Sequence, residues 1–299
     1  MEKNNVMFGG IMTALVSCLD ENENVNVAST EKLVNWHLSE GYTGFYLTGS
    51  TGEGPILPAK TRKSIVEAVK NATGDRGKVI VHVGDVNLAT ACDLAKHAGE
   101  IGADAISSVP PFFFRYNDAE ITDYYKALSD SCDLPIMMYA SPYTSSMQVD
   151  QVDKLMNIPR MIGLKWTSHD YFTMHRIKEL RGGNINVING ADECLLCGLS
   201  MGADGGIGAC YNMMPKLFQQ VYVNFKAGNM EAAQEAQYKA NKVIELLLKF
   251  GVIAGIKDAL NMIGFNVGNL ARPQKGLTDE ARAAFHAALK ELNYEQEYL

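Results

Sequence analysis

Long apolar runs are missing from this sequence of 299 residues. Nowhere do eighteen apolar residues follow one another, and the first residues carry no basic start followed by an apolar stretch, so neither a membrane span nor a signal peptide is expected. Basic residues are in the minority, with 27 Lys and Arg against 34 Asp and Glu and a formal net charge of −7. Nucleic-acid and anionic-membrane surfaces need a basic footprint. These absences favour a cytoplasmic protein with neither kind of partner.

Cysteine is also scarce. The six cysteines are too few and too scattered for a disulfide scaffold, and we expect them to be reduced. Cys194 and Cys197 form a C-x-x-C, but their segment has a helical pattern and no second pair accompanies it, so no metal site is predicted. We interpret the two as small core residues on one helical face.

The apolar residues that are present fall into eight short runs with a regular spacing. Helical patterns separate most of the runs, which begin roughly 20–35 residues apart. Repeated right-handed crossovers with this spacing produce a parallel sheet, and most economically a (β/α)8 TIM barrel. The runs cover residues 9–17, 43–49, 78–84, 104–110, 135–141, 161–167, 185–191 and 205–210.

After the eighth run the pattern changes. From about Pro215 the sequence is expected to be wholly helical, which predicts an appended helical bundle. The chain is therefore divided into a barrel over 1–212 and a C-terminal helical extension over 213–299. The extension is expected to pack on the barrel, so that the two form a single functional unit.

Lys165 stands at the end of the sixth run, in "IGLKWTSHDYF" at 162–172. Functional groups of such barrels gather at the carboxyl ends of the strands, so this side chain is expected at the barrel mouth. Burial there disfavours an ammonium ion, and a neutral amine can attack a ketone. The alternative is a structural lysine that snorkels to the surface or pairs with a carboxylate.

The loop after the second run reads Gly-Ser-Thr-Gly-Glu at 49–53. Its glycines permit a tight turn that exposes N–H groups, and Ser50 and Thr51 add two hydroxyl donors, so the loop suits a small carboxylate. It lacks the Gly-Lys-Ser/Thr ending of a P-loop. A plain turn that caps the next helix is the alternative.

Three other strand ends carry polar groups or glycine. Tyr139 ends the fifth run, where its phenol could relay a proton or simply pack with its hydroxyl bonded. Asp192 and Glu193 follow the seventh run at the start of a predicted helix, where acids also serve as dipole partners. Gly208 belongs to a Gly-Ile-Gly that matches only part of a dinucleotide fingerprint, and we interpret this segment as a loop that allows close approach of a ligand.

Together, Lys165, Tyr139 and the 49–53 loop resemble the family of class I pyruvate-dependent aldolases that includes dihydrodipicolinate synthase and N-acetylneuraminate lyase. The resemblance covers nearly the whole chain. Four stretches are most similar to the lyase branch, whose members split N-acetylneuraminate, a sialic acid, into pyruvate and N-acetylmannosamine. These stretches are "PPFFFRYNDAEITDYYKAL", "LKWTSHDYF", "NGADECLLCGLSMGADGGIGACYN" and "VIAGIKDAL".

The resemblance implies a reversible Schiff-base aldol cleavage that uses no metal and no other cofactor. Lys165 would attack the C2 ketone, and Tyr139 would move the proton to and from the C4 hydroxyl. Ser50 and Thr51 would hold the pyruvoyl carboxylate. Family members are typically tetramers, so a homotetramer is also implied. The positions expected to line the polyhydroxyl tail are Thr167, Gly190, Asp192, Glu193 and Gly208.

Some positions depart from the family pattern. The usual Tyr-Asn-Ile-Pro is replaced by Tyr139 followed by Ala140, Ser141 and Pro142, so the residues next to the tyrosine differ from those of the family. Ala209 stands where bacterial lyases commonly place a serine, so one hydroxyl contact to the sugar is lost.

Two further differences concern the synthases. Thr144 stands where they carry an arginine for a second carboxylate, and Phe113 and Phe114 occupy the segment from which they present a tyrosine to a neighbouring subunit. Two other functions stay open. The chain could be another pyruvate-forming 2-keto-3-deoxy sugar acid aldolase or dehydratase of the family, or a non-catalytic barrel that binds a keto acid or sialic acid.

Overall fold

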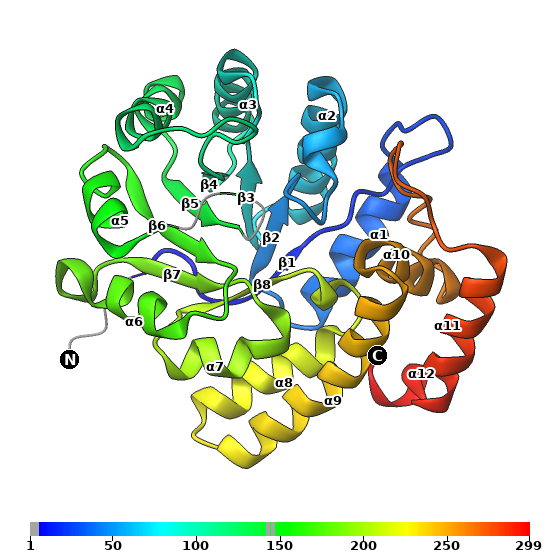
Figure 1. Ribbon diagram of the computed structural model, residues 1–299. Coiled ribbons are helices and arrows are strands. Elements are labelled where there is room, and N and C mark those ends of the chain that lie inside the picture. Colours follow the sequence, from blue (N-terminus) through cyan, green and yellow to red (C-terminus); the bar gives the residue numbers. More distant parts are fainter. Residues whose placement is uncertain (1–5, 142–143, 145–146) are drawn as a thin grey trace.

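The computed structural model describes residues 6–141, 144 and 147–299, and these contain a closed barrel of eight parallel strands (Figure 1). The strands pair in sequence order, and β8 closes the ring against β1. Each strand lies inside one predicted run, so the barrel prediction is confirmed. The strands are β1 (Gly10–Ala14), β2 (Gly44–Leu47), β3 (Lys78–His82), β4 (Ala105–Ser108), β5 (Ile136–Ala140), β6 (Met161–Trp166), β7 (Asn186–Asn189) and β8 (Gly205–Gly208).

The strands read as continuous apolar runs because they are buried on both faces. Side chains that alternate inward, such as Met12, Ile80 and Met137, fill the barrel interior. Those that alternate outward, such as Ile11 and Leu164, pack under the surrounding helices. Among the described residues the interior is therefore a packed core and not an open channel.

A helix follows each of the first seven strands, as the spacing predicted. Asparagine caps start several of them: Asn26, Asn87 and Asn117 each accept from backbone N–H groups of the first turn. The helices are α1 (Val27–Ser39), α2 (Ala59–Thr73), α3 (Leu88–Glu100), α4 (Asp118–Ser131), α5 (Val149–Leu155), α6 (Tyr171–Glu179) and α7 (Leu195–Ser200), with short 3₁₀ turns η1 (Gly54–Ile56), η2 (Leu180–Gly183), η3 (Asp192–Cys194) and η4 (Cys210–Asn212).

The C-terminal part consists of helices that lie along one side of the barrel (Figure 1). The helix prediction is confirmed for α8 (Pro215–Lys226), α9 (Met230–Phe250), α10 (Val252–Met262), α11 (Asp279–Glu291) and α12 (Tyr294–Glu297). The helix α8 packs on both β1 and α9. The division of the chain at 212/213 stays a prediction.

The expectation of an unbroken helical C-terminal part is wrong for residues 263–278, which contain no helix. Gly268 has a positive φ of 78° and approaches the Leu19 carbonyl so closely that a Cβ would lie 1.9 Å from its oxygen. Pro273 lacks a backbone donor. Val267 accepts a hydrogen bond from the Leu19 N–H (3.1 Å), so this non-helical segment lies against the chain that follows β1.

The cysteine prediction is wrong in one respect. Cys194 is partly buried, but Cys197 is exposed. The helix α7 turns Leu195 and Leu199, four residues apart, toward the core, so Cys197 falls on the solvent side. All six thiols are free. Across the described residues, no helix combines the length and the apolar character needed to cross a membrane.

A buried ion pair joins the barrel to the C-terminal helices. The Glu53 carboxylate, in the loop after β2, lies 2.6 Å from the Lys257 amine in α10, and the two side chains are 0% and 2% exposed. Lys257 also donates to the Asn269 carbonyl (2.7 Å), and Glu53 accepts from the Ala271 N–H (2.7 Å). The pair thus ties the β2 loop to α10 and to the non-helical segment that follows it.

We expect Lys257→Met to lower the free energy of unfolding by about 3–5 kcal/mol, because Glu53 would stay buried without its counter-charge. Adding Glu53→Gln should recover part of this loss, since no uncompensated charge would remain. Urea unfolding measures both. Lys96→Met, in an exposed pair with Glu100, is the matched control and should change stability little. A double variant that is less stable than the single one would contradict the prediction.

Candidate active site

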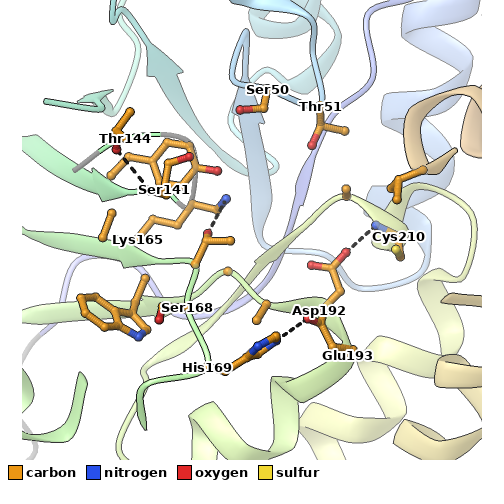
Figure 2. A pocket seen from close by; sticks show the side chains of 18 of the residues that line it. Ser50, Thr51, Ser141, Thr144, Lys165, Ser168, His169, Asp192, Glu193 and Cys210 are labelled. Atoms are coloured by element: carbon orange, nitrogen blue, oxygen red, sulfur yellow. Dashed lines mark hydrogen bonds and ion pairs between the residues drawn. The ribbon is translucent and has the colours of Figure 1, made fainter. Parts of the chain in front are cut away.

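The barrel mouth holds a cavity of about 870 Å³ at the carboxyl ends of the strands (Figure 2). Its wall is built by the segments that follow β2, β5, β6, β7 and β8, and by α9 and α10. The structure brings eight of the nine predicted site residues to this wall: Ser50, Thr51, Tyr139, Lys165, Thr167, Gly190, Asp192 and Glu193.

Lys165 and Tyr139 are direct neighbours in the sheet. They are register partners on β6 and β5, and the Lys165 amine lies 4.1 Å from the centroid of the Tyr139 ring. Lys165 is only 5% exposed, so the snorkelling alternative is wrong. Its amine donates to the Thr167 hydroxyl (3.4 Å), and no described carboxylate forms an ion pair with it. This buried amine is therefore free to meet a ligand.

The Tyr139 phenol is set between opposing influences. Burial raises its pKa, but the charge of Lys165 and hydrogen bonds with Thr167, Lys165 and Ser141 together leave the pKa below its ordinary value. The rings of Tyr46 and His82 meet the Tyr139 ring edge-on, at centroid distances of 6.0 and 6.1 Å, and fix its orientation. A phenol in this setting can both donate and accept a proton.

The structure shows what the residues that depart from the family pattern do around Tyr139. The Ala140 carbonyl accepts from the Thr167 N–H (2.9 Å), so the missing side chain leaves the strand pairing intact. Ser141 is buried and bonds the Tyr139 hydroxyl, a contact that the family's isoleucine could not make. Pro142 lies outside the described residues. Ala209 lines the cavity with only a methyl group.

The Ser50–Thr51 loop is held in place from several sides. The Thr48 hydroxyl donates to a β3 carbonyl (2.8 Å), and the Ser17 hydroxyl donates to a carbonyl within the loop (2.6 Å). Glu53 fixes the far end through the ion pair described above. The two hydroxyls are therefore presented to the cavity by a preorganised loop, as Figure 2 shows.

Asp192 is a buried carboxylate at the start of η3. Burial raises its pKa to about 6, although the N–H and thiol of Cys210 and the charge of Lys165 oppose the rise. Its oxygen accepts from the Cys210 N–H at 2.6 Å. A Cβ at Gly208 would lie 2.3 Å from the other oxygen, so Gly208 lies behind Asp192 and makes room for this side chain. We expected a ligand to approach Gly208 closely, but the group that lies against Gly208 is the Asp192 side chain.

The neighbouring positions form a polar wall. A Cβ at Gly190 would lie 2.1 Å from the Thr167 hydroxyl, so only glycine lets that hydroxyl lie against β7. Glu193, one residue beyond Asp192, accepts from the His169 ring at 2.6 Å. Hydroxyl and carboxylate oxygens thus line the side of the cavity next to Lys165.

The sequence reasoning missed several wall residues. His169 and Cys210 lie inside segments that were recognised, but neither carried a separate signal. The wall residues from the C-terminal part carried none, because their distance from the barrel mouth along the chain hides the contact. They are Ile244, Leu248, Val252 and Ile253 in α9 and α10, and Gln274 in the non-helical segment.

No group of three or more His, Cys, Asp or Glu side chains that could hold a metal ion occurs in the described part of the chain. The reactive groups gathered at the mouth are an amine, a phenol, two hydroxyls and carboxylates. This set suits covalent chemistry at a carbonyl carbon. The expectation that the reaction uses no cofactor stays a prediction.

The chain is similar to known proteins over most of its length. The model of the dihydrodipicolinate synthetase family matches residues 7–292. The chain belongs to this family. A Shigella boydii N-acetylneuraminate lyase is 36% identical over 274 residues, which are 91% of this chain and 92% of that protein. The family resemblance drawn from the sequence is therefore confirmed.

Solved structures of family members superpose closely. A Clostridium difficile protein, solved in complex with mannosamine, has a TM-score of 0.91 and 30% identity, covering 95% of this chain and 99% of its own. A Bacillus anthracis dihydrodipicolinate synthase has a TM-score of 0.90 and 30% identity, covering 95% and 98%. The protein solved with mannosamine and the synthase have nearly the same TM-score, so the fold does not distinguish between the two reactions. The distinction rests on the side chains of the site.

The raised pKa of Asp192 predicts a pH-dependent stability. A carboxyl with a raised folded-state pKa stabilises the protein below about pH 4, and this contribution is lost as pH rises through about 6. The amide of Asp192→Asn cannot ionise. When pH is raised from 4.5 to 8, we therefore expect the free energy of unfolding of this variant to rise by roughly 1–3 kcal/mol relative to that of the parent. Denaturant unfolding at the two pH values measures the gain. Asp123→Asn, at an exposed site, is the control; an equal gain there would refute the assignment.

Proposed function

We propose that this chain is a class I aldolase of the N-acetylneuraminate lyase type, which cleaves N-acetylneuraminate reversibly to pyruvate and N-acetylmannosamine. The observation that carries the proposal is the pairing of Lys165 and Tyr139 in register, in the same cavity as the hydroxyls of Ser50 and Thr51 and beside a polar wall. The curated lyase relative supports the same reaction.

In the proposed mechanism Lys165 attacks the C2 ketone and water leaves, which gives a protonated imine. The imine draws the electron pair of the C3–C4 bond as that bond breaks, and the enamine of pyruvate remains on Lys165. Tyr139 takes the proton of the C4 hydroxyl as it becomes the aldehyde, and it can return the proton in the reverse direction. Its position next to the amine supports this relay.

Binding would begin at the carboxylate. Ser50 and Thr51 donate to it from the preorganised loop. Hydroxyls of the sugar portion would then meet the polar wall. That wall consists of Thr167, Gly190, Asp192 and Glu193, with Gly208 providing the space for Asp192.

The cavity wall also favours the lyase reaction over the synthase reaction. Thr144 lines the cavity, and its hydroxyl donates to the Ser141 carbonyl (3.2 Å). No arginine occurs among the described residues of the wall, while Asp192 and Glu193 add negative charge. A substrate with a second carboxylate would lack an anchor, whereas a neutral polyhydroxyl aldehyde would find hydrogen-bond acceptors.

A homotetramer and a cytoplasmic location belong to the same proposal. Phe113 and Phe114, in the loop after β4, are 84% and 70% exposed and stack edge-on at 5.1 Å. Two neighbouring exposed phenylalanines favour a contact with another subunit. We also propose that residues 1–212 and 213–299 act as one unit, with the Glu53–Lys257 pair as the link.

The substrate is tested by comparing two condensations. We expect pyruvate to condense with N-acetylmannosamine about 10²-fold faster than with aspartate semialdehyde, because the second carboxylate of the condensation product has no charged partner. Thr144→Arg should narrow the difference. Turnover of both aldehydes by the parent and the variant measures this. Faster use of the semialdehyde by the parent would refute the lyase assignment.

The nucleophile is tested by trapping. Incubation with pyruvate and borohydride should leave a stable adduct on Lys165, located by mass spectrometry, because reduction fixes the imine. Lys165→Met should abolish the adduct and keep the fold, since methionine fits the apolar strand end. An adduct at another lysine would overturn the mechanism.

Tyr139→Phe is the matched control for this experiment. It removes only the hydroxyl, so the adduct should still form while turnover falls by roughly 10²–10⁴. Turnover near the parent rate would show that Tyr139 is not the proton relay and serves only in packing.

A further inference from the structure

His169 forms a contact between two neighbouring loops of the mouth that the sequence did not suggest. It lies in the loop between β6 and α6, four residues after Lys165, whereas Glu193 lies in η3 after β7. The His169 Nε2 and the Glu193 Oε1 are 2.6 Å apart, and both side chains line the cavity (Figure 2). The contact therefore joins two loops that carry other predicted site residues.

The backbone of Glu193 is fixed, but its carboxylate needs a further restraint. The Asn241 side chain in α9 donates to the Glu193 carbonyl (3.0 Å), which holds the main chain. The Glu193 side chain is 40% exposed, so it could adopt several rotamers. The bond to His169 engages one carboxylate oxygen and leaves the other free to accept from a ligand.

The acids next to Glu193 in the cavity wall already have partners. Asp170 caps α6 by accepting from the Thr173 N–H (2.9 Å) and hydroxyl (2.6 Å). Asp192 accepts from the Cys210 N–H. Glu193 is thus the acid that His169 orients.

The exposed fractions of the side chains show how deep each one lies in the cavity. Lys165 and Asp192 are 5% and 6% exposed, but the side chains of Glu193 and His169 are 40% and 68% exposed. The reacting ketone therefore lies deep, and the His169–Glu193 contact lies at the rim. We therefore expect a short keto acid held at Lys165 to end before the rim and a long polyhydroxyl tail to reach it.

We infer that His169 is a positioning residue that selects for long substrates by holding Glu193 toward the far hydroxyls of the tail. This inference rests on the proposed lyase function. His169 acts through Glu193 and takes no part in bond breaking. Its contribution should therefore appear in the binding of a nine-carbon keto acid and be absent from the binding of pyruvate.

The test uses four proteins: the parent, His169→Ala, His169→Gln and His175→Ala. For cleavage of N-acetylneuraminate, His169→Ala should raise KM about 10-fold and leave kcat within about twofold, as expected when a charge-assisted bond that orients a ligand group is lost. His169→Gln should recover most of this loss, because its amide can donate to Glu193. His175 also faces an acid, Glu179 at 3.6 Å, but on α6 away from the cavity, so His175→Ala should match the parent.

The second arm uses pyruvate as the short ligand. The pyruvate concentration for half-maximal borohydride trapping should be the same in the parent and in His169→Ala. Equal losses for both ligands, an unchanged KM in His169→Ala, or a His169→Gln no better than alanine would each overturn the inference. If the parent traps pyruvate but does not cleave N-acetylneuraminate, the proposed function fails first and the inference falls with it.

Discussion

The ion pair between Glu53 and Lys257 is the contact on which the site depends most. It buries two opposite charges between the β2 loop and α10, and additional bonds to the 269–271 backbone satisfy both groups. Such a pair is stable only if both partners stay in place, because either charge alone would be costly to bury. The loop that presents Ser50 and Thr51 therefore has one of its restraints in the C-terminal helices, beside the bonds that hold it within the barrel.

This dependence gives the C-terminal helices a role in the site itself. They supply the counter-charge for Glu53, and they also complete the cavity wall with side chains from α9 and α10. A barrel without them would keep Lys165 and Tyr139 in register but would lose one wall of the mouth. In the proposed function, the helical part and the barrel thus both contribute residues to one active site.

Electrostatic balance explains the rest of the mouth. The Lys165 amine is packed against the faces of Tyr139 and Tyr46 with no described carboxylate bound to it. Asp192 lies in the same cavity, yet its oxygen is taken by Cys210 and its burial raises its pKa. Separate partners keep the acid from neutralising the amine, and this leaves the amine available for attack on a carbonyl.

The sequence by itself determined the eight strands, because a strand buried on both faces must be apolar along its length, and it placed Lys165, Tyr139 and Ser50 at strand ends where the barrel topology brings them together. Only the tertiary structure decided the non-helical segment at 263–278, the solvent-facing Cys197, the Glu53–Lys257 pair and the contact of His169 with Glu193. These features join residues that are distant along the chain or depend on which side of a helix meets the core. Local periodicity contains neither kind of information.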